Sequence, residues 1–207
     1  MIKVEHLETY GWEAALRGVR NPMNSWAKSD TVFDEKGNPT FGPNDLDLMK
    51  RLFKAGTEHR KYLRQIGVSF DMTAPLYMLK EFDTYKVGTT ANSCSTMHTI
   101  HKKEFEMDDF SHEHLDEVCL GWLRDTINLL NCYRRDFIDT REKEYWWQLI
   151  QTLPSSYNQK RTFTMNYEVV FNILRQRSAH KLDEWKELCG ILRTLPLVKE
   201  LEDSLCE

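Results

Sequence analysis

The hydrophobic pattern of this chain changes its period around residue 66, and that change limits the folds open to it. Every second residue is apolar through Ile66, Val68, Phe70 and Met72, which is typical of a half-buried strand. The preceding residues, 46–65, place apolar side chains near helical spacing. Most of the remaining pattern is also helical and does not alternate regularly with strands. The sequence therefore predicts an α+β fold rather than an α/β fold.

Turn residues and helix signals divide the rest of the chain. Residues 30–44 are rich in Gly, Pro, Asn and Asp and predict a loop or hairpin. Pro75 opens a helix that we expect to end near Lys86, with a polar loop over residues 89–96. Ser111 is the expected N-cap of a long helix to residue 135. The buried side of that helix is expected to hold Leu115, Val118, Trp122, Leu129 and Tyr133. Later helices are expected over residues 140–153, 164–177, 181–193 and 198–205.

Composition narrows the class of protein. The 207 residues suffice for a single domain, 1–207, and the apolar fraction of 41% is that of a globular protein. The net charge of -4 argues against binding a nucleic-acid polymer. No apolar run reaches the roughly 20 residues needed to span a bilayer, and the N-terminus lacks signal-peptide features, so we expect a cytoplasmic protein. The wide spacing of the cysteines predicts free thiols and no metal site. These are Cys94, Cys119, Cys132, Cys189 and Cys206.

Two segments carry residues suited to chemistry, and the first spans residues 75–98. It leads from a helix into a run of hydroxyl and amide side chains. Such a run suits either an ordinary surface loop or a loop that binds phosphate and base edges. Cys94 is a rival nucleophile here, with His98 and His101 as nearby bases.

The second segment spans residues 153–185. One helix over residues 166–180 would align, at about 100° per residue, Asn166, Val170, Ile173, Arg177 and His180. Polar groups on such an apolar stripe either satisfy one another or face a ligand, because burying them unpaired costs several kcal/mol. Lys160 and Arg161 precede this helix, either as solvated surface or as partners of a phosphate.

This second segment resembles the C-terminal signature of the flavin-dependent thymidylate synthases. That signature contains Leu-Pro, a nearby Tyr, Thr-x-Asn, a second Asn six residues on, an Arg five further and a His shortly after. The matching residues are Leu153-Pro154, Tyr157, Thr164-Met165-Asn166, Asn172, Arg177 and His180. The resemblance covers about residues 46–185 and is strongest at its C-terminal end. It implies helices packed on a small, mostly antiparallel sheet.

The resemblance also implies roles for single residues in this signature. Asn166 and Asn172 would lie at the flavin ring of FAD, and His180 belongs to the same cofactor site. Arg177 would bind the pyrimidine and polarise it. His59 matches a histidine upstream of the strand that is expected at the cofactor.

The first segment is similar to a second motif of the same family, in which Arg-His-Arg is followed by Ser. Ser95 matches the serine that orients the nucleotide, and Glu81 stands where the family has a Gln at the substrate. The Arg-His-Arg positions, expected at the cofactor, hold Thr84, Tyr85 and Lys86. A Lys does not reproduce a bidentate Arg contact.

These departures mean that the nucleotide phosphate needs another cation. The Arg that follows the motif serine in the family appears here as Met97 or His98. Lys160, Arg161 and His98 are the candidates to replace the missing arginines.

The resemblance implies a homotetramer with sites shared between subunits. FAD would be reduced by NADPH, and the carbon unit of methylenetetrahydrofolate would pass to C5 of dUMP. One alternative keeps the fold and places another one-carbon group, such as hydroxymethyl, on a uridine nucleotide. The other alternative is a relative that binds a nucleotide without catalysis.

Overall fold

The computed structural model describes residues 2–205, and these divide into two compact units. Unit 1 contains residues 2–4, 72–84 and 92–162, and unit 2 contains residues 5–71, 85–91 and 163–205. The single domain expected over 1–207 stays a prediction. Cys206 lies outside the described residues.

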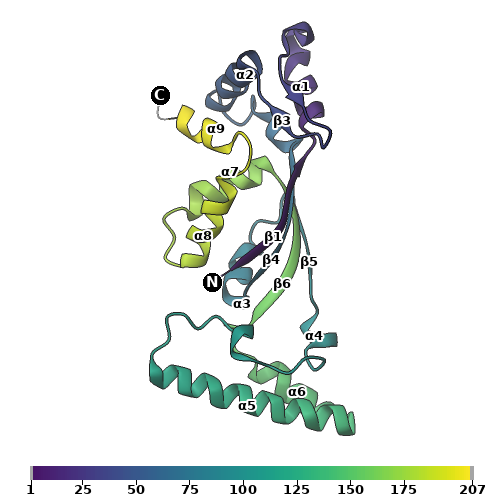
Figure 1. Ribbon diagram of the computed structural model, residues 1–207, viewed down its shortest axis with the longest axis vertical. Helices are drawn as coiled ribbons and strands as arrows, with labels where there is room; N and C mark the ends of the chain where they lie inside the picture. The colour runs from purple at the N-terminus through teal and green to yellow at the C-terminus, as the bar shows by residue number, and fades with distance from the viewer. Residues whose placement is uncertain (1, 206–207) are drawn as a thin grey trace. The chain divides into compact units, whose positions relative to one another are not determined.

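A four-stranded antiparallel sheet runs through the chain in the order β1-β4-β6-β5 (Figure 1). Its strands are β1 (Lys3–Tyr10), β4 (Gly67–Pro75), β5 (Thr89–Ser93) and β6 (Asn158–Asn166). Strand β4 buries Val68, Phe70, Met72 and Ala74 and leaves the residues between them partly exposed. The alternating pattern around residue 66 is thus confirmed as a half-buried strand. The mixture of sheet and helix confirms the α+β fold.

Unit 2 holds five α-helices around an aromatic core. They are α1 (Trp12–Arg20), α2 (Pro43–Lys54), α7 (Tyr167–Arg177), α8 (Asp183–Leu192) and α9 (Val198–Ser204), and α7 and α8 lie side by side (Figure 1). The Trp12 ring packs edge-on against Tyr167, with 5.1 Å between centroids. Three short 3-10 helices complete the unit, at Asn21–Met23, Trp26–Lys28 and Lys61–Arg64. Strands β2 (Val32–Phe33) and β3 (Pro39–Thr40) pair as the hairpin expected over residues 30–44.

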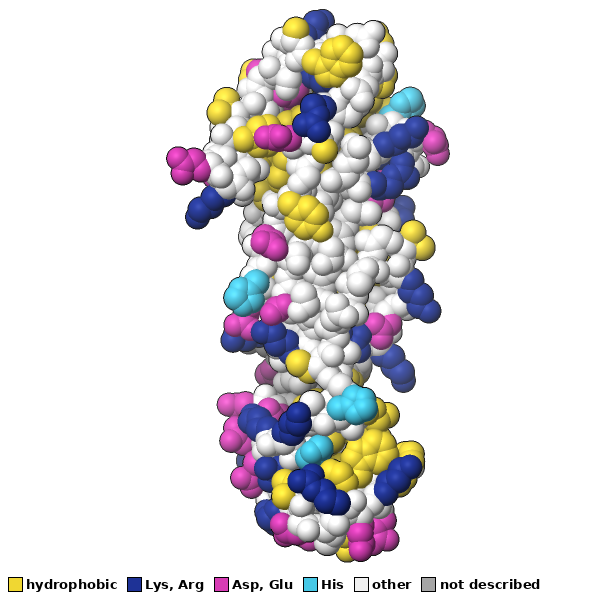
Figure 2. Space-filling view, turned by 90° about the vertical axis from the view of Figure 1, so that its right-hand side faces the viewer, with side chains coloured by type: hydrophobic (Ala, Val, Ile, Leu, Met, Phe, Trp, Pro, Cys, Tyr) yellow, Lys and Arg dark blue, Asp and Glu magenta, His cyan; other side chains and the backbone are white. Residues whose placement is uncertain are grey.

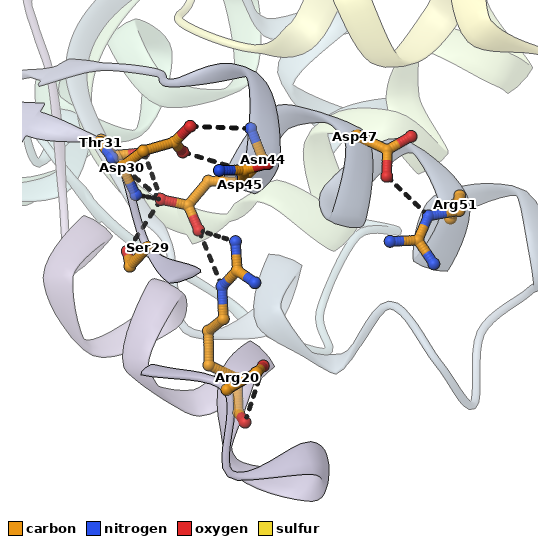
Figure 3. Close-up of polar contacts among 9 residues, drawn as sticks. Arg20, Ser29, Asp30, Thr31, Asn44, Asp45, Asp47 and Arg51 are labelled. Atoms are coloured by element: carbon orange, nitrogen blue, oxygen red, sulfur yellow. Dashed lines mark hydrogen bonds and ion pairs between the residues drawn. The ribbon is translucent and has the colours of Figure 1, made fainter. Parts of the chain in front are cut away.

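A buried ion pair joins α1 to α2 inside unit 2 (Figure 3). Arg20 is 5% exposed and Asp45 is fully buried, and the guanidinium meets one carboxylate oxygen at 2.6 and 2.9 Å. The other oxygen accepts hydrogen bonds from the hydroxyls of Ser29 and Thr31, both at 2.8 Å. Two backbone N–H groups, of Asp30 and Thr31, also donate to it. The charge of Asp45 is therefore fully compensated within unit 2.

Unit 1 is built on α5 (Glu117–Thr140) and α6 (Lys143–Thr152), which pack against each other. Its core contains Ile100, Phe105, Phe110, Leu123, Leu130 and Leu149. The shorter elements are α3 (Leu76–Phe82), α4 (Thr96–Thr99) and a 3-10 helix at Met107–Asp109. Figure 2 shows apolar side chains and histidines gathered on the surface over α4 and the neighbouring ends of α5 and α6. Within residues 2–205, no helix combines the length and apolar character needed to cross a membrane.

Several expected helix boundaries are wrong. The helix expected over 46–65 ends at Lys54, and Gly56, at a φ of +101°, turns the chain away. The helix after Pro75 ends at Phe82 rather than near Lys86. The polar loop expected over 89–96 is largely the exposed edge strand β5.

The long helix of unit 1 differs from its prediction in its start and its buried side. It begins at Glu117 because the side chain of Asp116 accepts a hydrogen bond from the Cys119 N–H at 2.9 Å. Ser111 is buried instead, and its hydroxyl donates to Asn158 at 3.0 Å. The buried face carries Leu123, Thr126, Ile127, Leu130 and Asn131. The face expected inside is largely exposed, since Val118 is 82% and Trp122 63% accessible.

Candidate functional site

Arg177 is held between two aromatic rings of unit 2. It is the last residue of α7, and its Nε donates to the Tyr85 hydroxyl at 3.0 Å. The guanidinium carbon lies 4.8 Å from the centre of the Trp185 ring and 5.7 Å from that of Tyr85. Cation–π attraction from both rings and the hydrogen bond restrict the plane of the guanidinium. The side chain is half-buried, so it keeps a solvent-facing portion.

Tyr85 contacts two neighbouring residues of α7, Arg177 and Gln176. The Tyr85 hydroxyl donates to the side-chain carbonyl of Gln176 at 3.0 Å. The same hydroxyl oxygen accepts a hydrogen bond from Arg177. The Tyr85 hydroxyl therefore acts as both donor and acceptor toward residues of α7. A residue expected at the cofactor is thus placed in direct contact with the residue expected at the pyrimidine.

His180 joins the same cluster from outside the helix. Because α7 ends at Arg177, the single helix expected over 166–180 is wrong at both ends. The Nδ1 of His180 accepts from the Leu182 N–H at 3.2 Å, and its ring centroid is 6.3 Å from that of Trp185. Trp185 is fully buried and is therefore the common support for Arg177 and His180.

Asn166 is the N-cap of α7 and not a residue within it. Residues 164–166 end strand β6, and the Asn166 side-chain oxygen accepts from the Val169 N–H at 3.2 Å. Gly88 faces this amide with a φ of +77°, and a Cβ at Gly88 would lie 2.8 Å from the Asn166 Nδ2. The close approach and the positive φ favour glycine at position 88, and the hydrogen bond from Val169 orients the amide. Asn172 is half-buried on α7.

Two further residues expected at the cofactor lie elsewhere on the surface of unit 2. His59 is exposed and lines an open cavity of about 890 Å³ together with Lys61 and Arg64. Lys86 is exposed next to Tyr85 in the chain. The structure therefore brings together Tyr85, Arg177 and His180 in contact with Trp185, but it does not bring His59 into that cluster.

In unit 1, the two cations expected to precede a helix lie on strand β6. Arg161 is 15% exposed and forms an ion pair with Asp83 at 2.7 Å, and its Nε donates to Gln159 at 2.9 Å. The backbone carbonyl of Lys160 accepts from the Cys94 N–H at 2.9 Å. Arg161 is therefore already paired with a carboxylate.

The hydroxyl-rich segment of unit 1 is ordered around Ser95. The Ser95 side chain caps α4 by accepting from the His98 N–H at 3.2 Å. Thr84 donates its hydroxyl to the Glu81 carbonyl at 2.8 Å, at the end of α3. The thiol of Cys94 is exposed.

His101 is part of the packing around α5. Its ring packs edge-on against Phe137, with 5.0 Å between centroids. Burial lowers the pKa of His101, and the nearby charges of Arg141 and Lys102 lower it further. The ring of His101 thus belongs to the packing of unit 1 against Phe137.

Trp185 and Gln176 complete the Arg177 cluster and were not among the predicted site residues. Trp185 follows Arg177 by eight residues and lies on another helix, so no local spacing predicts their contact. Among residues 2–205, no group of three or more His, Cys, Asp or Glu side chains is arranged to hold a metal ion.

The chain is similar to known proteins in its three-dimensional structure. No protein-family model and no curated protein matches the sequence. The thymidylate synthase ThyX of Helicobacter pylori, solved with FAD and dUMP, aligns over 100% of both chains at a TM-score of 0.70 and 21% identity. A second structure of this flavin-dependent thymidylate synthase, also with FAD and dUMP, covers 98% of both chains at a TM-score of 0.67 and 19% identity. The chain has the fold of a flavin-dependent thymidylate synthase.

A methylase shares this fold as well. PolB of Streptomyces cacaoi, a UMP/dUMP methylase solved with 5-Br dUMP, aligns over 97% of this chain and 94% of its own at a TM-score of 0.63 and 12% identity. The flavin-dependent thymidylate synthase fold expected from residues 153–185 is thus confirmed, and at these identities it is the fold alone that is shared.

Proposed function

We propose that this protein is a flavin-dependent enzyme that transfers a one-carbon unit to C5 of a pyrimidine nucleotide, with dUMP as the first candidate. The observation that carries the proposal is the guanidinium of Arg177 held between Tyr85 and Trp185. The solved structures that share the fold support it, because they were solved with FAD, dUMP or 5-Br dUMP bound.

Arg177 would act on the base through its planar fork of N–H donors. Attack by C5 requires negative charge to develop on the ring, and a fixed donor near a ring carbonyl stabilises that charge. The hydrogen bond to Tyr85 and the stacking on Trp185 keep the guanidinium oriented before substrate arrives. This preorganisation lowers the reorganisation cost in the reaction.

The residues around α7 fit a flavin. Asn166 and Asn172 would hold the ring through their amides, since an isoalloxazine ring presents carbonyls and ring nitrogens to such groups. The hydrogen bond from the Val169 N–H orients the amide of Asn166. Bound FAD would supply hydride chemistry to the one-carbon unit, and the protein supplies placement and electrostatics. NADPH would reduce FAD, and methylenetetrahydrofolate would be the carbon donor.

The remaining roles belong to unit 1 and are proposed separately. Ser95 would orient the nucleotide, and Glu81 would contact it. Lys160, Arg161 and His98 stay the candidate cations for the phosphate, and Arg161 would have to leave its ion pair with Asp83 to reach it. Within the proposal the protein is a cytoplasmic homotetramer.

A second candidate function changes the nucleotide or the product. It is favoured by Thr84 and Lys86, which replace two arginines of the family motif. The UMP/dUMP methylase PolB supports a broader choice of nucleotide on this fold. One form of this second function is the transfer of a hydroxymethyl group to a uridine nucleotide, which gives a product different from thymidylate.

One incubation separates these functions. The purified protein is mixed with dUMP, methylenetetrahydrofolate and NADPH, and the nucleotide is analysed by mass spectrometry. Thymidylate supports the first proposal, and a product heavier by one oxygen supports the second. A protein that is colourless, that retains no added FAD once the free flavin is removed, and that leaves dUMP unchanged contradicts both proposals. Such a result favours a non-catalytic relative.

A further inference from the structure

A small pocket of unit 2 is lined by one face of α1 and by residues 26–33. Its volume is about 270 Å³. A cavity of about 150 Å³ holds a benzene molecule, so this pocket has room for one aromatic ring with a polar group attached. The lining side chains include Glu13, Leu16, Arg17, Arg20, Trp26 and Phe33.

The guanidinium of Arg20 uses only one of its edges to bind Asp45. Its Nε and Nη2 contact the same carboxylate oxygen, at 2.9 and 2.6 Å. The end edge consists of Nη1 and the second N–H of Nη2, and Figure 3 shows Nη1 pointing away from Asp45. Within residues 2–205, Nη1 has no hydrogen-bond partner and is not among the fully buried atoms that lack one, so it stays accessible although Arg20 is only 5% exposed. Two parallel N–H groups of this kind match the two oxygens of a carboxylate.

Trp26 and Phe33 give the pocket an aromatic lining. Trp26 is 51% exposed, and its indole N–H donates to the side-chain oxygen of Asn21 at 2.8 Å, which holds the ring in place. Phe33 is half-buried. An exposed tryptophan whose N–H is already bonded offers the face of its ring to an aromatic ligand.

A second cation lies one turn before Arg20 on the same face of α1. Arg17 pairs with Glu13 at 3.8 Å, and both side chains are about two-thirds exposed. An exposed pair of this kind contributes little to stability, so Arg17 is able to contact a ligand in the pocket instead. The charge of Asp45 is already compensated by Arg20 and by four further hydrogen bonds. The pocket therefore favours an anionic group over a neutral one.

We propose that this pocket binds a small aromatic carboxylate. The two carboxylate oxygens accept hydrogen bonds from the end edge of Arg20, in the bidentate geometry that guanidinium and carboxylate groups share. The aromatic ring packs against Trp26 and Phe33, and Arg17 adds a second positive charge. None of these residues belongs to the Arg177 cluster, so the pocket is a second site beyond the proposed reaction.

Benzoate is the probe that tests the pocket most simply. Saturation-transfer NMR on the intact protein measures its affinity, and we expect a Kd of about 1 mM or tighter for a ligand of this size. Benzamide has the same ring and a carbonyl oxygen but no charge. We expect benzamide to bind at least fivefold more weakly than benzoate, because it cannot form the bidentate ion pair.

Substitutions at exposed positions locate the bound benzoate without disturbing the buried ion pair. Trp26→Leu removes the larger aromatic ring of the lining, and Arg17→Gln removes the second cation, so each should weaken benzoate binding at least threefold. Trp147→Leu makes the first of these changes at an exposed tryptophan of α6, and we expect it to bind benzoate as the wild type does.

Arg20→Lys tests the end edge itself. The lysine keeps a positive charge beside Asp45 but has no fork of N–H groups, so benzoate binding should fall at least tenfold. Far-UV circular dichroism checks that this variant folds. If the buried substitution prevents folding, the Trp26→Leu and Arg17→Gln variants still decide the question.

Any of three results with folded protein would overturn the proposal. They are no saturable binding of benzoate up to about 20 mM, equal affinity for benzamide and benzoate, and an unchanged benzoate Kd in Trp26→Leu. None of these readouts depends on flavin or nucleotide, so they stand apart from the proposed enzymatic function.

Discussion

Replacing Asp45 by Asn tests how strongly the buried ion pair stabilises unit 2. Burial alone raises the pKa of Asp45, but hydrogen bonds from Arg20, Thr31 and Ser29 outweigh it and lower the pKa from 3.8 to about 2. That difference corresponds to about 2.5 kcal/mol of stability when the carboxylate is charged, at about 1.36 kcal/mol per pKa unit. In Asp45→Asn, Arg20 also stays buried without its counter-charge, so we expect a total loss of roughly 3–5 kcal/mol at pH 7.

The pH dependence has a defined sign. The folded protein depresses the pKa of Asp45, so the stabilisation is present above pH 4, the range of the unfolded group. It is lost progressively as the pH falls toward 2, roughly the folded pKa. The stability gap between wild type and Asp45→Asn should therefore narrow between about pH 5 and pH 2.5.

Urea unfolding at a series of pH values measures this gap, and Asp47→Asn is the matched control. Asp47 pairs with Arg51 one turn along α2 (Figure 3), and both side chains are about two-thirds exposed. Such a surface pair contributes about 0.5 kcal/mol or less. A loss below about 1 kcal/mol for Asp45→Asn, or a gap that stays constant from pH 7 to pH 3, would show that the buried ion pair does not stabilise unit 2 in this way.

Three further predictions concern the candidate site. Tyr85→Phe keeps the ring and removes the hydroxyl that holds Arg177, so kcat should fall about tenfold or more with little change in melting temperature; an unchanged kcat would rule out a positioning role. Gly88→Ala forces a Cβ against Asn166 at a positive φ, and we expect a stability loss of about 1–2 kcal/mol and weaker FAD binding, measured by denaturation and flavin titration. Cys94→Ser should retain full turnover, because the reaction proposed here uses no thiol; complete loss of turnover would restore Cys94 as a nucleophile.

The sequence correctly predicts an element when its apolar residues follow a single period, such as every second residue in a strand. Strand β4 alternates buried and partly exposed residues, and the hairpin at residues 30–44 follows from its turn residues. The prediction of the buried side of α5 was wrong because that helix is apolar on two faces. Periodicity alone cannot tell which of the two faces meets the core. Val118 and Trp122 belong to the exposed one.

The candidate site was predictable only in part. Arg177 and Asn166 carry the family resemblance, Tyr85 stands at a position where the sequence departs from the family motif, and the structure gives each a defined environment. The N-cap role of Asn166 has a sequence signal, since Asn is a preferred cap, but the spacing over residues 166–180 predicts a position inside the helix. The contact between Tyr85 and Arg177 joins residues 92 positions apart, so only the folded chain reveals it.

Binding of the pyrimidine by Arg177 is central to the proposed function, and dUMP affinity measures it directly. Isothermal titration of the FAD-loaded protein with dUMP should give a Kd at least tenfold weaker in Arg177→Ala. Arg177→Lys should recover little of the loss, because Lys lacks the planar fork. Equal dUMP affinity in the wild type and Arg177→Ala, with both proteins folded and loaded with FAD, would exclude Arg177 as the group that binds the pyrimidine.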